Sequence, residues 1–441
     1  MSPLLTAPIA PTLARLAAPG IVLALFQTAV SVADTYYVGR LGTESLAGLA
    51  LVFPMVMLLQ MTSAGAMGGG VSSAVARALG AGHRDSARTL VVHGLAIGVG
   101  GGLAFTLLLL VFGRNLYRLL GGSGEPLEQA LAYSDLLFSG AVLVWLANTL
   151  ASVLRGSGNT LTPALAFAGT ALVQIPLSGA LTLGWGPFPR LGIAGAAIAY
   201  VTAFGLASLA MAIGVWRSPL RPHRAHWHFE GRLFREILRV GALSSLSAVQ
   251  TVLTAVILTG FVARFGTAAL AGFGVGARLE LLQVPIVFAI AQALVVMVGT
   301  NIGGGQIARA KRIAWTGMGA SMLVCLAIGW SVAIYPRLWV HIFSDDPQVL
   351  EIGSLYMRIV APLYPLFGGG LALYFASQGA GQMLMPLFAN TARLVLVVAG
   401  GGLVMQLSGP LWALFAVVAL GLTVYGGLTG YVVYRARWER S

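Results

Sequence analysis

The sequence predicts an all-α integral membrane protein with twelve transmembrane helices. Of its 441 residues, 58% are apolar and only 9% are charged, and the mean hydropathy is +0.87. A soluble protein carries about a quarter of charged residues, so most of this surface must face lipid. The apolar runs are also continuous and reach the ~20 residues that a helix needs to cross the hydrocarbon core. In the strands of a transmembrane β-barrel, apolar and polar residues would instead alternate over about ten residues.

Polar segments separate the twelve predicted spans into two sets of six. The spans are expected near 13–39, 46–77, 89–113, 127–153, 162–185 and 192–216, and then near 240–263, 269–299, 312–335, 349–376, 386–407 and 411–434. We therefore predict an N-terminal six-helix lobe (1–216), a cytoplasmic basic loop between the lobes (217–239) and a C-terminal six-helix lobe (240–441). Together these spans occupy the whole chain and leave no room for a soluble domain.

Basic residues give the predicted orientation. The net charge is +13, and the arginines gather in alternate loops, most densely between 217 and 239. The positive-inside rule then predicts that both termini are cytoplasmic, in a plasma (inner) membrane. Because the basic residues follow the loops, we expect contact with membrane lipids and no binding of nucleic acid. Cys325 is the only cysteine, so no disulfide can form within the chain. The first apolar run lacks a basic leader and is interpreted as a retained helix.

An internal repeat relates the two sets of spans. VGRLGTESLAG at 38–48 matches VARFGTAALAG at 262–272 at seven of eleven positions, and glycines further along recur at a similar spacing. Six predicted spans separate the copies, so both copies cross the membrane in the same direction. Two parallel, pseudo-symmetric lobes with a substrate cavity between them are typical of transporters.

Asp34 is the leading candidate for a functional charge. Charged side chains within a membrane are costly, and they are usually functional. Gln27, Ser31 and Asp34 follow one another at i, i+4 and i+7, so one stripe of an otherwise apolar helix is polar. Asp34 either lies at the outer interface beside two tyrosines or binds and releases a proton. Its repeat partner is Leu258, which favours coupling in the N-terminal half alone.

Secondary candidates lie in other spans. Asp135 is expected either at the outer interface or in a pocket. For Glu280 we expect an ion pair with Arg278 or a contact with a helix end, and a pocket role is the alternative. Gln250 and Gln283 are further polar candidates in the C-terminal lobe.

Motifs of catalysis and metal binding do not occur in the sequence. No GxxxxGK[ST], GxSxG or HExxH pattern is present, so we predict neither ATP-driven transport nor an enzyme. His223, His226 and His228 lie in the basic loop, where we expect them to be solvated rather than to bind a metal. We therefore expect no cofactor and no metal site.

Four segments resemble the multidrug and toxic compound extrusion (MATE) family. They are DTYYVGRLGTESLAG (34–48), LRGSGNTLTP (154–163), GFGVGARLE (272–280) and GGGQIARAKR (303–312). The resemblance covers essentially the whole chain. It implies two six-helix lobes that form a V-shaped cavity, and efflux of drug-like compounds by alternating access, as an antiporter driven by inward H⁺ or Na⁺ flow.

The resemblance is closest to the DinF-like branch in the first helix. In that branch an aspartate takes up the proton and a proline fifteen residues earlier lets the helix bend, which corresponds to Asp34 and Pro19. The branch also has an N…D pair that falls on Gln174 and Ser178, so the second acid is missing here and H⁺ is favoured over Na⁺. The resemblance further implies an N-lobe pocket, which we expect to include Asn148, Gln174, Ser178, Tyr200, Met55 and Met61.

Two alternatives within transport stay open. One is a flippase of lipid-linked precursors, which would need Arg278, Arg358 and Arg393 in the cavity. The other is Na⁺-coupled export. For an exporter we expect small amphipathic or drug-like substrates, and we expect a monomeric protein.

Overall fold

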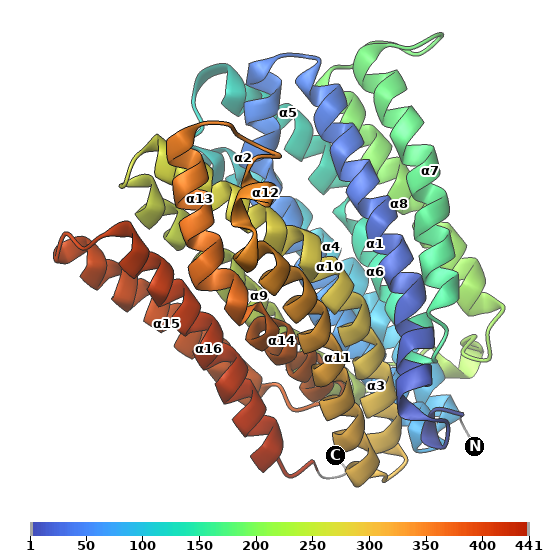
Figure 1. The fold of residues 1–441 in the computed structure, drawn as a ribbon. Coiled ribbons are helices and arrows are strands. Elements are labelled where there is room, and N and C mark those ends of the chain that lie inside the picture. The colour runs from blue at the N-terminus through green and yellow to red at the C-terminus, as the bar shows by residue number, and fades with distance from the viewer. Residues whose placement is uncertain (1–2, 439–441) are drawn as a thin grey trace. The chain divides into compact units, whose positions relative to one another are not determined.

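The structure is a computed structural model that describes residues 3–438, apart from the side chains of residues 281 and 282 (Figure 1). It is helical throughout, and these residues contain no strand. Contacts divide the chain into two compact units. We call residues 18–242 the N unit, and residues 1–17 together with 243–441 the C unit.

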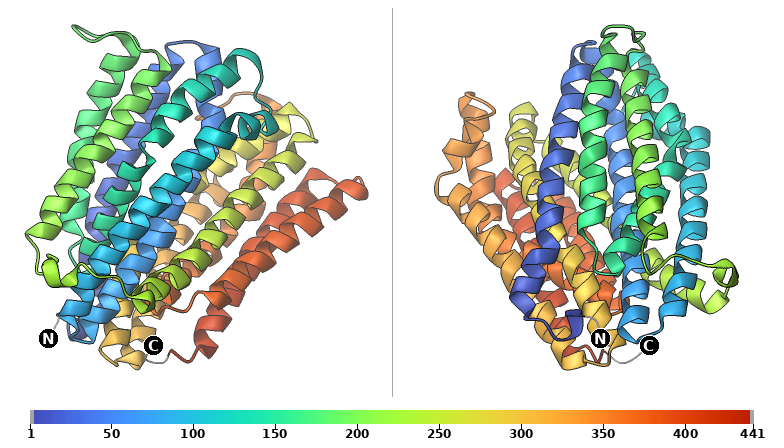
Figure 2. Two further views of the ribbon diagram at one scale, coloured as in Figure 1. Left: turned by 180° about the vertical axis from the view of Figure 1, so that it is seen from behind. Right: turned by 90° about the vertical axis from the view of Figure 1, so that its right-hand side faces the viewer.

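The N unit contains the first set of apolar runs as helices. Its elements are α1 (Ile9–Gly39, from residue 18 onward), α2 (Thr43–Gln60), the π-helix η2 (Met61–Met67), α3 (Gly68–Gly80), α4 (Arg84–Leu119), α5 (Gly124–Ser139), α6 (Ala141–Gly156), α7 (Leu161–Leu183), α8 (Ile193–Trp216) and η3 (Arg224–His226). Within this unit α1 and α7 lie side by side (Figures 1 and 2). That pairing positions the side chains of the candidate site.

The C unit contains the second set. Its elements are η1 (Pro3–Leu5), α9 (Gly231–Ala263, from residue 243 onward), α10 (Thr267–Gly303), α11 (Ile307–Ile334), α12 (Pro336–Val340), α13 (Pro347–Val360), η4 (Ala361–Leu363), α14 (Tyr364–Gly379), α15 (Leu384–Gln406) and α16 (Leu411–Arg435). The last two helices form a neighbouring pair in both figures. Their close packing brings Arg393 of α15 against α16.

The number of spans agrees with the prediction. Among the described residues, eleven helices are long and apolar enough to cross a membrane, and a bent pair raises the number to as many as twelve. The bent pair is α5 and α6, which meet at 49° beside Gly140. The span predicted at 127–153 is therefore two helices rather than one.

The repeat is visible in the backbone as well as in the sequence. Gly82 and Gly305 follow the ends of equivalent helices, and both have a left-handed backbone conformation, with φ of 81° and 73°. Gly158 and Gly381 do the same, with φ of 88° and 75°. Only glycine adopts this conformation readily, which explains why glycine stands at the same turns in both halves.

Two helices continue from one unit into the other. The division falls after Ala17 in α1 and after Ala242 in α9. The N-terminal end of α1 packs in a core of the C unit, where Asn301 Nδ2 donates to the Leu4 carbonyl at 3.1 Å. The first turns of α9 belong to the N unit, where Arg77 and Glu236 form an ion pair at 2.9 Å. The lobes predicted at 1–216 and 240–441 remain a prediction, but the structure groups residues 1–17 with the second half.

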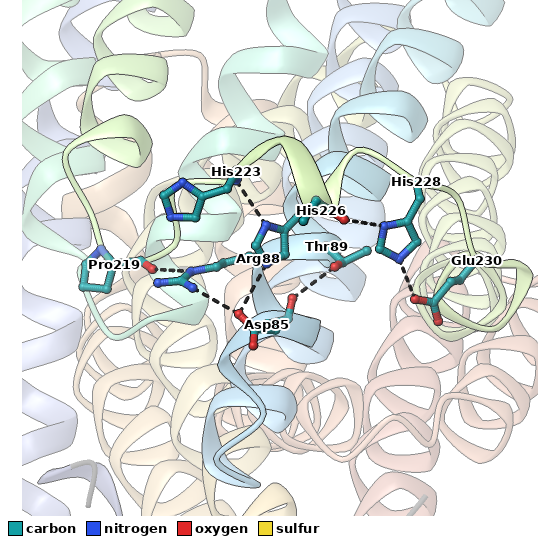
Figure 3. A network of polar contacts seen from close by, with 9 residues as sticks. Asp85, Arg88, Thr89, Pro219, His223, His226, His228 and Glu230 are labelled. Atoms are coloured by element: carbon teal, nitrogen blue, oxygen red, sulfur yellow. Dashed lines mark hydrogen bonds and ion pairs between the residues drawn. The ribbon is translucent and has the colours of Figure 1, made fainter.

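The basic segment after α8 returns to the start of α4 (Figure 3). Arg88 Nε donates to the Pro219 carbonyl at 3.1 Å, and His226 Nε2 lies 3.3 Å from Asp85 Oδ1. The Glu230 backbone N–H donates to His93 Nε2 at 2.9 Å. The segment is therefore folded against the N unit, and the expectation that His226 is solvated is wrong because that ring is buried against α4.

Candidate functional site

The carboxylate of Asp34 is held by two side chains from α7. Ser178 Oγ donates to Oδ1 at 2.5 Å, and Gln174 Nε2 donates to Oδ2 at 3.2 Å. Both residues are buried, and they lie four residues apart, so they share one face of the helix. The structure thus brings together Asp34, Gln174 and Ser178, three residues that the sequence analysis singled out.

The surroundings of Asp34 supply hydrogen bonds but no balancing charge. Within residues 3–438 the partners of this carboxylate are a hydroxyl and an amide, and no basic side chain pairs with it. The rings of Tyr133 and Tyr200 are close enough to interact with it electrostatically. Asp34 is half-buried, and an ionised acid without a counter-ion is costly to remove from water. The site is therefore a hydrogen-bonded acid without a counter-ion among the described residues.

A second polar cluster in the N unit joins α2, η2, α6 and α8. Gln60 Nε2 donates to the Tyr200 hydroxyl at 2.6 Å, and Asn148 Nδ2 donates to Gln60 Oε1 at 3.2 Å and to Ser63 Oγ at 2.8 Å. Gln60 ends α2 directly before the π-helix, an irregularity that is common at functional sites. The predicted residues Asn148 and Tyr200 are therefore joined through Gln60, which the sequence analysis missed. A lone amide inside an apolar run was the available signal.

The other N-unit candidates do not contact Asp34. Gln27 and Ser31 are exposed on α1, and Pro19 lies inside that helix, which continues through it. The side chains of Met55 and Met61 are half-buried. Asp135 is exposed on α5, consistent with the interface position that was one of its two interpretations.

Glu280 of the C unit has tyrosine partners instead of the expected arginine. The Tyr356 hydroxyl donates to Glu280 Oε1 at 2.6 Å, and the Tyr364 hydroxyl lies 3.4 Å from the same atom. The guanidinium of Arg278 lies over the ring of Phe343, 4.9 Å from its centroid. The expected ion pair between Arg278 and Glu280 is thus absent from the described residues, because each group contacts aromatic residues instead.

The remaining candidates of the C unit are dispersed. Gln250 donates to Thr391 Oγ1 at 2.8 Å and accepts from Asn390 Nδ2 at 3.3 Å. Gln283 is fully buried, and neither end of its amide has a hydrogen-bond partner among the described residues. Arg358 is exposed on α13. No group of three His, Cys, Asp or Glu side chains in the described part of the chain has metal-binding geometry.

Comparison with known proteins gives a consistent result. The sequence model of the MatE family matches residues 19–179 and again residues 244–403, once in each half of the repeat. A FAD transporter of Shewanella oneidensis is 29% identical over 89% of this chain and 87% of its own length. A probable multidrug resistance protein NorM of Deinococcus radiodurans is 29% identical over 97% of this chain and 96% of its own length.

Solved structures show the same fold. A MOP superfamily transporter from Pyrococcus furiosus superposes with a TM-score of 0.89, at 24% identity, over 98% of this chain and 96% of that one. The fold class and the family resemblance predicted from the sequence are confirmed. Since the family consists of transporters, the prediction that the chain is not an enzyme is confirmed as well. The chain is an integral membrane protein that belongs to the MatE family of multidrug efflux transporters.

Proposed function

We propose that this protein is an H⁺-coupled antiporter that exports small molecules and takes up the coupling proton at Asp34. The observation that carries the proposal is the pair of neutral donors, Ser178 and Gln174, on a carboxylate without a counter-ion. When Asp34 is ionised, both donors stabilise the charge. When a proton arrives, the charge disappears and the hydrogen bonds weaken, so the two states favour different packing of α1 against α7.

Helix α1 can transmit that difference. Pro19 lacks an N–H and leaves the carbonyl of Arg15 without its helical hydrogen bond, so bending there is less costly than elsewhere. The division between the units falls two residues before Pro19. We infer that proton uptake at Asp34 from the outer face bends α1 at Pro19, closes the N-unit pocket and releases substrate outward during alternating access.

A proton fits the site better than Na⁺. A metal ion needs several oxygen ligands that include negative charge, and Asp34 is the only carboxylate among the residues that the structure brings together here. Na⁺ coupling is the weaker alternative for that reason. The three arginines that a pyrophosphate-binding flippase would need also have separate surroundings, since Arg278 contacts Phe343 and Arg393 contacts Phe367 and Tyr425.

The relatives suggest the range of substrates. Their names include multidrug export and FAD transport, so we propose small, partly aromatic compounds that share no single charge. We further propose an inner-membrane location with both termini in the cytoplasm, because the basic residues gather in the loops of that side.

Dye uptake into inverted vesicles tests the coupling. A pH gradient and a Na⁺ gradient are applied separately to vesicles with wild-type protein, Asp34→Asn and Asp135→Asn. We expect that the pH gradient alone drives dye uptake by the wild-type protein. Uptake should fall to the level of empty vesicles in Asp34→Asn and should be unchanged in Asp135→Asn. Asparagine has nearly the same shape but cannot carry the proton. Uptake driven by Na⁺, or wild-type uptake in Asp34→Asn, would place the coupling site elsewhere.

A further inference from the structure

Arg393 places a positive charge near the middle of the membrane. It lies nine residues after Leu384, the start of α15, which corresponds to roughly 14 Å along a helix that spans the membrane. A guanidinium at this depth is costly unless it meets a polar partner, and a lipid headgroup lies too far away to provide one. The side chain is partly exposed at the surface of the C unit, so a ligand can reach it.

The neighbouring helices orient this side chain without neutralising it. Gly421 of α16 lies beside the stem, where an added Cβ would be 3.5 Å from Arg393 Cγ. The guanidinium carbon lies 5.8 Å from the centroid of the Phe367 ring and 5.9 Å from that of the Tyr425 ring. The two rings are themselves 6.3 Å apart. Two aromatic residues therefore flank one cation.

The donors of Arg393 are not used within the described chain. No hydrogen bond and no ion pair joins the guanidinium to any of residues 3–438. Its contacts are with the faces of the two aromatic rings. Glu280 is near enough for electrostatic attraction, but its carboxylate accepts from Tyr356 and Tyr364. Asn390, one turn before Arg393, is bonded to Gln250 and the Ser247 carbonyl. The five N–H donors of the Arg393 guanidinium therefore make no hydrogen bond to the described residues.

We propose that Arg393 and Phe367 form a binding site for a planar aromatic compound that carries a phosphate. The guanidinium would bind the phosphate with paired hydrogen bonds, and the half-buried ring of Phe367 would pack against the aromatic part of the compound. The ring of Tyr425 is buried and supports the guanidinium from within the C unit. This site rests on the proposed role as an exporter of small molecules and names one class of substrate. It lies in the C unit and uses none of the residues that bind Asp34.

Binding of riboflavin and of riboflavin 5′-phosphate to the purified protein tests the site. The two compounds share one fluorescent ring system and differ by the phosphate, so quenching of the flavin reports both affinities. We expect wild type to bind the phosphate ester about ten- to a hundredfold more tightly, as for a charge-assisted contact. Arg393→Gln should abolish this preference while riboflavin still binds, which also shows that the variant is folded. Arg358→Gln is the matched control and should keep the preference.

Further variants separate the parts of the site. Arg393→Lys keeps the charge but loses the paired donors, so part of the preference should remain. Phe367→Leu removes the half-buried ring and should weaken the binding of both flavins to the same degree. Equal binding of the two flavins by wild type, no binding of either, or a preference that survives Arg393→Gln would overturn the proposal. Because equilibrium binding needs no gradient, Asp34→Asn should bind as wild type does, so failure of this site and failure of proton coupling are distinguishable.

Discussion

The Asp34 site of the N unit has an apolar counterpart in the C unit. Leu258 stands at the repeat position of Asp34, and Val397 and Gly401 stand where the other half has Gln174 and Ser178. Leu258 and Val397 belong to one hydrophobic core, and Gly401 is covered by the ring of Phe261. The equivalent helices therefore hold a carboxylate with its donors in one unit and a packed core in the other. The two halves of the repeat share the turns of the backbone but differ in the side chains at these equivalent positions.

The amides Gln60 and Gln283 show the same divergence. They lie 223 residues apart, the spacing of the repeat glycines. Gln60 is bonded to Tyr200 and Asn148, whereas Gln283 is buried without a partner among the described residues. The residues 223 positions after Asn148 and Tyr200 are leucine and threonine. The described residues of the C unit therefore do not repeat this network.

The largest effect is expected from placing an acid in the C unit. Leu258→Asp would bury a carboxylate where Val397 and Gly401 offer no donor, so we expect a loss of roughly 3–5 kcal/mol in the free energy of unfolding. Thermal unfolding in detergent measures it. Leu258→Asn has nearly the same shape without the charge and should cost less, roughly 1–3 kcal/mol. Equal losses in the two variants would show that the C unit tolerates an acid and would remove the contrast between the units.

A smaller effect, of opposite sign in the two units, is expected at the paired amides. Gln60→Leu removes the hydrogen bonds to Tyr200 and Asn148 and should destabilise the protein by about 1–3 kcal/mol. Gln283→Leu replaces an unpaired buried amide and should be neutral or stabilising by about 1 kcal/mol. Each variant is the control for the other in the same unfolding assay. Destabilisation by Gln283→Leu as large as by Gln60→Leu would mean that this amide does have a partner.

The smallest effect concerns the basic segment after α8 in the N unit. Hydrogen bonds to the Glu230 carboxylate and then to the Ala225 carbonyl raise the pKa of His228 above its usual 6.5 (Figure 3). A raised pKa adds stability below pH 6.5 that is lost as the pH rises through the raised value. We expect His228→Gln to remove this small pH dependence of the unfolding midpoint. A profile identical to that of wild type would show that the His228 contacts add no stability.

Much of the fold could be predicted because the membrane imposes it. Continuous apolar runs of sufficient length can only be helices there, so the spans follow from hydropathy. The repeat glycines predicted equivalent turns, and the left-handed backbone at Gly82 and Gly305 shows why those glycines recur. The family resemblance had assigned Gln174 and Ser178 to the N-lobe pocket, and the structure joins both of them to Asp34.

Other features could not be predicted because they depend on distant partners. Nothing in the pattern of residues 1–17 indicates that they pack with α10 and α11 rather than with the helices that follow them. Glu280 stands two residues from Arg278, yet its partners are tyrosines 76 and 84 residues away. The sequence likewise did not show the bend at Gly140, where the side chain of Val201 fills the space that a Cβ would occupy. Local sequence identifies polar groups in the membrane but not the groups that they meet.

The way that α1 is shared between the units also determines the order in which the protein can fold. The N unit is one continuous stretch, and it can assemble once residue 242 has left the ribosome. The C unit needs the first seventeen residues, whose contacts run from Leu4 to Asn301 and from Ala7 to Arg309. At bacterial and eukaryotic rates of synthesis, that segment waits roughly 15–60 s for these partners. The first part of the chain to be made is therefore among the last to reach its native contacts.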